Sequence, residues 1–446
     1  MEVSKTEEEG ISLLEQLLFF VPLGATSLLI SVTHSLFNAA IARLPNPELY
    51  GSAFQVGKSL MQVVQNPVAM IKQMMAALIK DKESYYKVRN FTIILVTSVL
   101  LFFTILVFSG GAEWIFKNLM GVKEDVLKHA LTVVKILIIF PAAVSLRNFM
   151  QGVAIKFRRT PLVTIATIAR VTFVSIIILF ISKITFIPPS MIPSFMFLGA
   201  VFVEAITVTI GVKLSIKDIP TSIEGLNTRK VNMNVREINY RLIIGFFAPL
   251  VITSFIRALA KPIIDSGLAR TIDPKTAIFT YGVAWGLGVI VVSPLMMFHQ
   301  VPLNFIEGNN KEQINSVKKF AIILGIFLSS ILGLMAFSPI GTIILTNIIG
   351  VSDKIALLSV DVLKVMTILP MAMVIRQFYW GMLMKEHKTS YISIGKIINL
   401  VMLFIAIFIA NLFNPANAAL VGIIGKVSSE AFESLYLYII NRKVKE

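Results

Sequence analysis

An otherwise apolar stretch, residues 246–270, carries three ionisable side chains in its second half. Arg257, Lys261 and Asp265 are spaced four residues apart, so a helix would place them along one face. A charge near the middle of a bilayer costs about 2.5–3.5 kcal/mol on insertion scales, so such side chains usually face protein or water. We therefore predict that this stripe lines the protein interior, with Arg257 and Lys261 as ligand contacts. The alternative is a Lys261–Asp265 pair that only locks the helix.

Proline residues accompany these polar stripes. Pro262 lies inside the first stripe and frees a backbone carbonyl that then needs polar partners or water. Lys58 begins a second stripe, with Gln62 and Gln65, ahead of Pro67. We predict Lys58 as a further ligand contact. The alternative is that its ammonium group extends toward a membrane face.

Two arginines, Arg147 and Arg376, each follow a proline by six residues in apolar segments. A guanidinium group offers a planar fork that holds a carboxylate or phosphate with two hydrogen bonds. We predict that this pair binds an anion. The alternative is structural ion pairing with Glu204 and Glu433, which lie in later apolar segments.

Residues 19–43 are similar in sequence to residues 246–270, and they have His34 and Asn38 at the positions of Lys261 and Asp265. His34 is a candidate proton carrier because the pKa of histidine lies near neutrality; a hydrogen-bonded structural histidine is the alternative. Asp265, His34, Asn38, Glu204 and Glu433 are the predicted coupling or gating residues, a role in which side chains exchange partners during a conformational cycle.

Charge and composition narrow the class of protein. Basic residues outnumber acidic ones at the predicted membrane depth, so a cavity built from them would be electropositive and favour anionic solutes. The sequence has no cysteine, its four histidines lack ligand spacing, and it carries no P-loop, GxSxG or dinucleotide motif. We therefore expect neither an enzyme nor a metal site. The net charge of +16 follows largely from basic loops, so no nucleic-acid partner is needed.

The positioning elements are membrane helices. The 446 residues are 56% hydrophobic and only 15% charged, and apolar stretches of roughly 20 residues recur, which is the length of a membrane-spanning helix. The distribution of lysine and arginine between the loops predicts that both termini are cytoplasmic. The twelve predicted spans are 11–43, 54–80, 88–116, 126–157, 161–182, 190–214, 238–268, 276–304, 315–346, 355–385, 390–410 and 415–441.

The chain repeats itself after about 227 residues. Residues 19–43 align without a gap with residues 246–270, and the alignment continues, with a shift of two, from Gly121 to Gly350. Six helices per copy place both copies in the same orientation across the membrane. We predict lobes at 1–214 and 238–446 joined by a cytoplasmic linker at 215–237, with alternating access by rocking of the lobes; the alternative is a duplication with a structural or channel role.

The order and spacing of several stretches resemble a known family. The sequence is similar to the MOP flippase superfamily, which includes MATE multidrug exporters and lipid-linked oligosaccharide flippases, and within it resembles the progressive ankylosis (ANK) family. The stretches that carry the resemblance are Val21-Pro22-Leu23-Gly24, KSLMQVVQNP at 58–67, Arg257 with KP at 261–262, IIGV at 348–351, LPMAMVIRQFYWGMLMKEHKT at 369–389, and Glu433 ahead of YLYIINRK.

This resemblance implies an all-α membrane protein of twelve transmembrane helices in two parallel six-helix repeats, a MATE-like V-shaped bundle. Animal ANK proteins are associated with the export of anions such as citrate, pyrophosphate and ATP. The resemblance implies Arg147, Arg257, Lys261 and Arg376 as anion contacts. Where some MATE exporters have an acidic coupling residue in the first helix, this sequence has His34 and Asn38.

Together these observations predict a secondary active transporter of the plasma (inner) membrane that exports an organic or phosphate-bearing anion. We expect no cofactor beyond a coupling proton or Na⁺, a monomer surrounded by membrane lipids, and a small anionic substrate as the partner. The alternatives are a MATE-type exporter of cationic drugs, which would need an acidic cavity, and a flippase for lipid-linked precursors, in which arginines would hold a lipid pyrophosphate.

Overall fold

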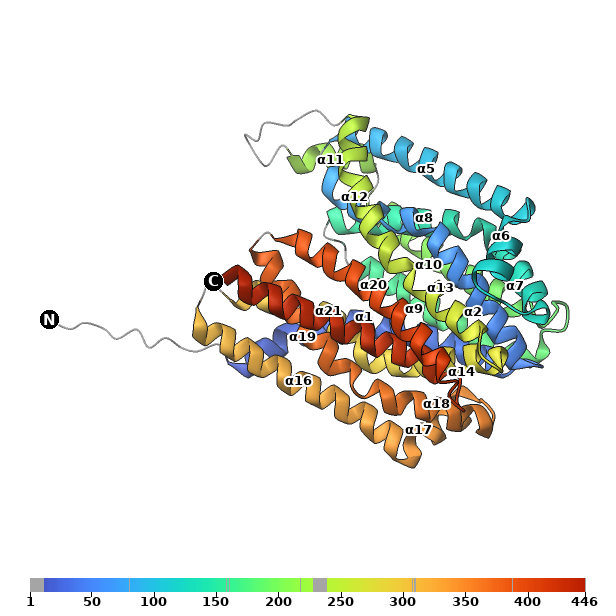
Figure 1. Ribbon diagram of the computed structural model, residues 1–446. Coiled ribbons are helices and arrows are strands. Elements are labelled where there is room, and N and C mark those ends of the chain that lie inside the picture. Colours follow the sequence, from blue (N-terminus) through green and yellow to red (C-terminus); the bar gives the residue numbers. More distant parts are fainter. Residues whose placement is uncertain are drawn as a thin grey trace. The chain divides into compact units, whose positions relative to one another are not determined.

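The structure is a computed structural model, and the regular secondary structure in the part that it describes is helical (Figure 1). No strand occurs among the described residues. These residues are 12–79, 81–157, 159, 161–216, 218–227, 239–306, 308, 310–386 and 388–445.

The helices fall into two series that follow the sequence repeat. The first series is α1 (Leu13–Ala42), α2 (Pro47–Val64), α3 (Asn66–Ala69), α4 (Ile71–Leu78), α5 (Lys82–Phe108), α6 (Gly111–Trp114), η1 (Ile115–Leu119), α7 (Glu124–Ile136), η2 (Leu137–Ile139), α8 (Phe140–Lys156), α9 (Pro161–Phe180), η3 (Ile181–Lys183), α10 (Ile192–Ser215) and α11 (Ile219–Asn227). The second series is α12 (Tyr240–Ala258), α13 (Ala260–Ala269), α14 (Pro274–Val292), η4 (Ser293–Met297), α15 (Gln300–Phe305), α16 (Lys311–Phe337), α17 (Pro339–Ile343), η5 (Ile344–Ile349), α18 (Asp353–Met366), α19 (Leu369–Lys385), α20 (Thr389–Leu412) and α21 (Leu420–Lys445).

Two pairs of equivalent helices begin and end at equivalent residues. Helices α5 and α16 are both 27 residues long, and the second lies 229 residues after the first at both ends. Helices α8 and α19 are both 17 residues long and are related by the same shift. The backbone therefore carries the duplication seen in the sequence.

The equivalent helices α5 and α16 also start in a similar way. The Asp81 side chain accepts a hydrogen bond from the backbone N–H of Ser84 at 2.7 Å, and the Ser84 hydroxyl accepts one from the backbone N–H of Asp81 at 2.9 Å. Asn310, at the equivalent position, accepts from the backbone N–H groups of Glu312 and Gln313. Such caps satisfy amide donors that have no partner within the helix.

Two π-helical segments mark matching positions in the repeats. The segments η1 and η5 begin at Ile115 and Ile344, which are 229 residues apart. Each precedes a glycine in the left-handed region, Gly121 with φ +71° and Gly350 with φ +85°. Glycine adopts this conformation without the steric cost that a Cβ would add. The Gly121–Gly350 match predicted from the sequence thus marks the same backbone turn in both copies.

Eight helices in the described part are long and apolar enough to cross a membrane. Helices α18 and α19, bent by 41° at their junction, form a ninth span if they are counted together. The other predicted spans correspond to α1, to the broken series α2–α4, and to α21, whose polar residues lower its hydropathy. The protein is therefore an integral, multi-pass membrane protein.

The seventh predicted span, 238–268, is broken near its middle. Helix α12 ends at Ala258 and α13 begins at Ala260. Pro262 lacks an N–H group and cannot bond to the carbonyl of Ala258 four residues earlier, so the helical ladder is interrupted there. The break lies close to Pro262 and separates Arg257 on α12 from Lys261 and Asp265 on α13.

The described residues form two compact units. Of the described residues, those within 12–35, 283–348 and 352–445 belong to unit 1, and those within 36–282 and 349–351 belong to unit 2. Within unit 2, α12 packs against α3 and α4, and α13 packs against α2. The seventh helix thus packs with helices of the first repeat, and these units differ from the lobes 1–214 and 238–446, which remain a prediction. The predicted linker contains α11; residues 217 and 228–238 lie outside the described part.

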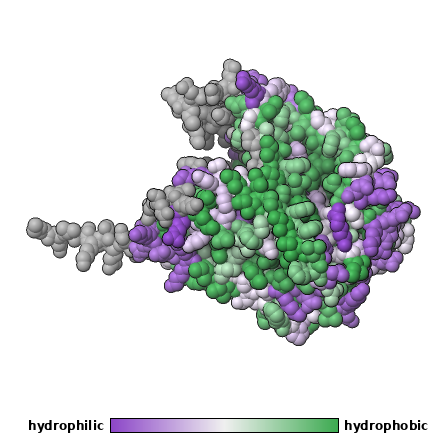
Figure 2. Space-filling view, in the orientation of Figure 1, coloured by the Kyte–Doolittle hydropathy of each residue, from purple (hydrophilic) through white to green (hydrophobic). Residues whose placement is uncertain are grey.

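Large apolar side chains cover the outer flanks of the long helices. On the face drawn in Figure 2, hydrophobic residues cover the helix flanks, and hydrophilic residues gather toward helix ends. Soluble proteins rarely expose apolar patches of more than a few hundred Å². These flanks therefore face lipid. Examples are Ile93, Phe102, Phe327, Leu334, Phe404 and Phe408.

Candidate functional site

A buried ion pair lies on α13, after the break in the seventh helix. The Lys261 ammonium pairs with the carboxylate of Asp265 one turn later. The Asp265 side chain is 0% exposed, and its Oδ2 atom has no hydrogen-bond partner among the described residues. A buried carboxylate needs a cation or donors to offset the loss of hydration. Lys261 supplies the cation, and the Ser59 side chain of α2 also interacts with the carboxylate.

Lys58, on the neighbouring helix α2, adds a second ammonium group to this site. It is only 8% exposed, and its Nζ lies 5.4 Å from the ring centre of Phe54 and 5.6 Å from that of Phe197. Lys58 interacts electrostatically with both Lys261 and Asp265. Among the described residues no carboxylate lies within salt-bridge distance of Lys58. We call Lys58, Lys261 and Asp265 the α2–α13 cluster; two cations and one anion leave it with one net positive charge.

Polar side chains of α1, α2 and α14 also lie in unit 2, which contains the α2–α13 cluster. The Tyr281 ring of α14 is centred 5.5 Å from the Nζ of Lys261. The Asn38 amide of α1 donates to the carbonyl of Gly282 at 2.8 Å, and the Gln55 amide of α2 donates to Asn38 Oδ1 at 3.2 Å. Asn38, a predicted coupling residue, therefore links α1, α2 and α14 through hydrogen bonds.

A second polar group in unit 2, the Glu204 cluster, surrounds a carboxylate on α10. Glu204 accepts from Arg170 Nη1 at 2.8 Å, from Arg147 Nη1 at 3.3 Å and from the Gln151 amide at 3.1 Å. The Glu204 side chain is almost completely buried, whereas that of Arg147 is 21% exposed. The two cations on one anion again leave one net positive charge.

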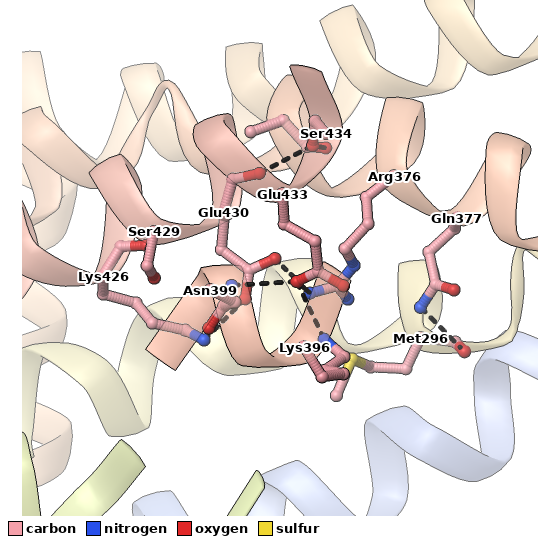
Figure 3. A network of polar contacts seen from close by, with 11 residues as sticks. Met296, Arg376, Gln377, Lys396, Asn399, Lys426, Ser429, Glu430, Glu433 and Ser434 are labelled. Atoms are coloured by element: carbon pink, nitrogen blue, oxygen red, sulfur yellow. Dashed lines mark hydrogen bonds and ion pairs between the residues drawn. The ribbon is translucent and has the colours of Figure 1, made fainter. Parts of the chain in front are cut away.

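Unit 1 contains a corresponding group, the Glu430–Glu433 cluster (Figure 3). The Arg376 guanidinium of α19 pairs with Glu430 of α21, and its Nη1 lies 3.7 Å from a carboxylate oxygen of Glu433. Arg376 is only 3% exposed. Figure 3 shows the guanidinium directed toward both carboxylates. The ion-pairing alternative for Arg376 is therefore present in the structure.

Three further side chains complete this cluster. Lys396 and Asn399, both on α20, each donate to Glu433 at 2.9 Å. Lys426 on α21 donates to Glu430 at 2.6 Å. Three cations and two anions leave one net positive charge, as in the Glu204 cluster.

The family model of the progressive ankylosis protein (ANKH) matches residues 10–233 and 231–431, which together cover most of the sequence. The chain belongs to the progressive ankylosis family. The resemblance proposed from the sequence is thereby confirmed.

Solved structures with the same fold include transporters of the MOP superfamily and a lipid flippase. A multidrug resistance MATE family transporter in an inward-facing conformation aligns with a TM-score of 0.73 at 12% identity, over 93% of this chain and 94% of its own. The lipid II flippase MurJ, in an inward closed conformation, aligns with a TM-score of 0.67 at 14% identity, over 95% and 87%. A MOP superfamily transporter from Pyrococcus furiosus, described as having a binding pocket of reverse polarity that suggests a different function, aligns with a TM-score of 0.58 at 14% identity, over 98% of both chains. The predicted MATE-like fold with two repeats is confirmed for this progressive ankylosis family member.

The remaining predicted site residues lie elsewhere on the helices. Arg257 is exposed on α12 and has an interaction partner, and His34 is half-buried on α1 within unit 1. The roles proposed for them stay predictions. Among the described residues no group of three or more histidine, aspartate or glutamate side chains could hold a metal ion.

Several residues of the clusters in this progressive ankylosis family member were not among the predicted site residues. Helical spacing gives a signal for two of them, because Lys426, Glu430 and Glu433 fall on one face of α21. Asn399 and Gln151 give no such signal, because a neutral amide at membrane depth does not stand out in a sequence. The cluster residues outside the predicted set are Gln151, Arg170, Lys396, Asn399, Lys426 and Glu430.

Proposed function

We propose that the protein is a secondary active transporter that exports an organic or phosphate-bearing anion by alternating access. The observation that carries this proposal is the α2–α13 cluster, where the buried ammonium of Lys58 lies beside the Lys261–Asp265 pair and has no carboxylate of its own among the described residues. An unpaired cation at membrane depth is costly, and such residues mark substrate or ion pathways. An anion with several oxygens, of the citrate, pyrophosphate or nucleotide class, would offset this cost.

In the proposed mechanism the substrate competes with Asp265 for Lys261. Without substrate, Asp265 neutralises one of the two ammonium groups. When an anion binds Lys58 and Lys261, Asp265 loses its cation and becomes a buried carboxylate, which favours uptake of a proton or Na⁺. Release of the anion restores the ion pair and expels the coupling ion. This exchange would couple anion movement to an ion gradient.

The three arginines have two different proposed roles. Arg147 keeps part of its side chain exposed and Arg257 is exposed, so both remain proposed anion contacts. Arg376 is enclosed by Glu430 and Glu433. We assign it to holding α19 against α21 rather than to direct contact with substrate. Glu204 and Glu433 are proposed gating residues, because each binds donors from two other helices.

The MOP fold is compatible with pockets of different charge. The Pyrococcus furiosus transporter of the same fold is described as having a pocket of reverse polarity. A surplus of basic groups in each cluster supports an anionic rather than a cationic substrate. We further propose that the protein is monomeric and not an enzyme, and that it lies in the plasma (inner) membrane with both termini in the cytoplasm.

The test is anion uptake into proteoliposomes that contain the purified protein. Labelled citrate, pyrophosphate and ATP are offered in parallel with a cationic dye and a lipid pyrophosphate. We expect uptake of at least one of the three anions, and a ten- to hundredfold loss at low substrate concentration in Lys58→Gln, since a hydrogen bond to a charged group contributes about 1.5–3 kcal/mol. Lys135→Gln, at an exposed lysine of α7, is the matched control and should transport normally. Uptake of the dye alone, or movement of the lipid alone, would contradict the proposal.

A further inference from the structure

A groove on unit 1 runs between α16, α19 and α21. It encloses about 580 Å³, within the range of sites that hold small molecules. Its floor consists of three buried small side chains, one from each helix: Ala321, Ala372 and Ser434. Larger residues at these positions would fill the groove. The shape therefore results from small residues on three neighbouring helices.

The walls of this groove are apolar and open to the helix surface. Ile322 of α16, Ile368 next to α19 and Leu435 of α21 line it, and all three are exposed. Helix α16 is one of the apolar membrane spans. The groove therefore opens toward the hydrocarbon of the bilayer, where an acyl chain is the available occupant.

One end of the groove is polar. Lys318 of α16 lies there with Tyr379 of α19 and Tyr438 of α21, whose ring centres are 5.7 Å apart. Lys318 is roughly two turns after the start of its helix, and Tyr438 roughly two turns before the end of its own, a level at which tyrosine and lysine commonly meet lipid headgroups. Lys318 is exposed, and among the described residues no acidic side chain lies within salt-bridge distance of it.

We infer that this groove binds one anionic phospholipid, with its phosphate at Lys318 and an acyl chain over Ala321, Ala372 and Ser434. The positive charge at one end and the apolar walls beyond it match the two parts of such a lipid. Neither the α2–α13 cluster nor the Glu204 cluster takes part, so the inference is independent of the transported substrate.

The bound lipid would also support the Glu430–Glu433 cluster. The Ser434 hydroxyl donates to the carbonyl of Ala372 at 2.7 Å and so joins α21 to α19 at the groove floor. Glu433 is the preceding residue, and Phe378 of the groove wall lies two residues after Arg376. An acyl chain packed on this floor would cover the contact between α19 and α21, the two helices that the Arg376–Glu430 ion pair joins.

Native mass spectrometry of the purified full-length protein in detergent tests the inference. The probes are phosphatidylglycerol and phosphatidylcholine with identical acyl chains. We expect one tightly retained phosphatidylglycerol, a loss of at least fivefold in its occupancy for Lys318→Gln, and normal occupancy for Lys319→Gln. Lys319 is the matched control because it is exposed beside Lys318 but does not line the groove.

A second variant tests the acyl-chain part of the site. Ala321→Leu would fill the floor, and we expect it to prevent retention of the lipid while the elution volume and helical circular dichroism stay unchanged. If that variant unfolds, the smaller change Ala321→Val replaces it. Equal losses in Lys318→Gln and Lys319→Gln, equal retention of both lipids, or normal lipid binding in the folded groove-filling variant would overturn the inference.

Discussion

Arg376 on α19 and Glu430 on α21 form an ion pair in which both side chains are almost completely buried. The equivalent arginine of the first repeat, Arg147, instead shares Glu204 with Arg170. The two repeats thus use the same arginine position with different acids: Glu430 corresponds to Val201, which has no charge. The second repeat compensates for its additional acid with Lys426.

Removing the acid from this pair should destabilise the protein. Glu430→Gln leaves the buried guanidinium of Arg376 with only the longer contact to Glu433. Loss of one partner of a buried pair typically costs about 3–5 kcal/mol. We expect a large decrease in the thermal unfolding midpoint of the detergent-purified variant, measured by loss of helical circular dichroism.

A matched control exists on α18, where Asp361 and Lys364 form a partly exposed pair at 3.0 Å. Lys364→Gln should lower the stability by less than about 1 kcal/mol, because solvent screens an exposed pair. Equal effects of Glu430→Gln and Lys364→Gln would contradict the structural role assigned to Arg376.

Lys58 and Lys261 should respond in opposite ways to the same substitution. Lys58→Met removes a buried cation whose loss of hydration costs several kcal/mol, against a cation–π gain of about 2 kcal/mol, so the variant should be more stable by roughly 1–2 kcal/mol. Lys261→Met leaves Asp265 buried without its cation and should be less stable by about 3–5 kcal/mol. Thermal unfolding of both variants measures the difference.

The double variant Lys261→Met/Asp265→Leu provides the check on this explanation. It removes both charges and should recover most of the stability lost in Lys261→Met. A destabilised Lys58→Met protein would mean that Lys58 has a structural partner and does not serve as a substrate contact.

The sequence predicted the membrane helices and the repeat because both depend on local patterns. Apolar length identifies a span, and the match of Gly121 to Gly350 reports a backbone conformation that recurs in both copies. It also predicted that Lys261 and Asp265 share a face, because four residues separate them on one helix.

Contacts between distant segments could not be predicted from local sequence patterns. That Arg376 selects Glu430 over the matched acid Glu433 depends on how α19 and α21 pack, and the pattern of one helix does not determine this. Likewise, Arg257 is exposed on α12 and Asp265 is buried on α13, on either side of the break at Leu259. Spacing alone would have kept the three residues on one continuous face.

The left-handed glycine after η5 should not tolerate a side chain. Gly350→Ala places a Cβ on a residue with φ +85°, which costs about 1–2 kcal/mol. Gly333 in α16 is the control: it is helical and has no atom within 4 Å of an added Cβ, so Gly333→Ala should stabilise the helix by up to about 1 kcal/mol. Unfolding midpoints that move in the same direction in both variants would contradict this assignment of the turn.

Asp265→Asn should separate substrate movement from ion coupling. The amide keeps the shape of the side chain but cannot take up a proton, and it no longer neutralises Lys261, so anion binding should be retained or strengthened. We expect exchange of labelled anion across proteoliposomes to continue while accumulation driven by a proton or Na⁺ gradient falls at least tenfold. The exposed Asp125→Asn, on α7, is the control and should leave both activities intact. Gradient-driven accumulation at the normal rate in Asp265→Asn would place the coupling site elsewhere, with Glu204 and Glu433 as the next buried carboxylates to substitute.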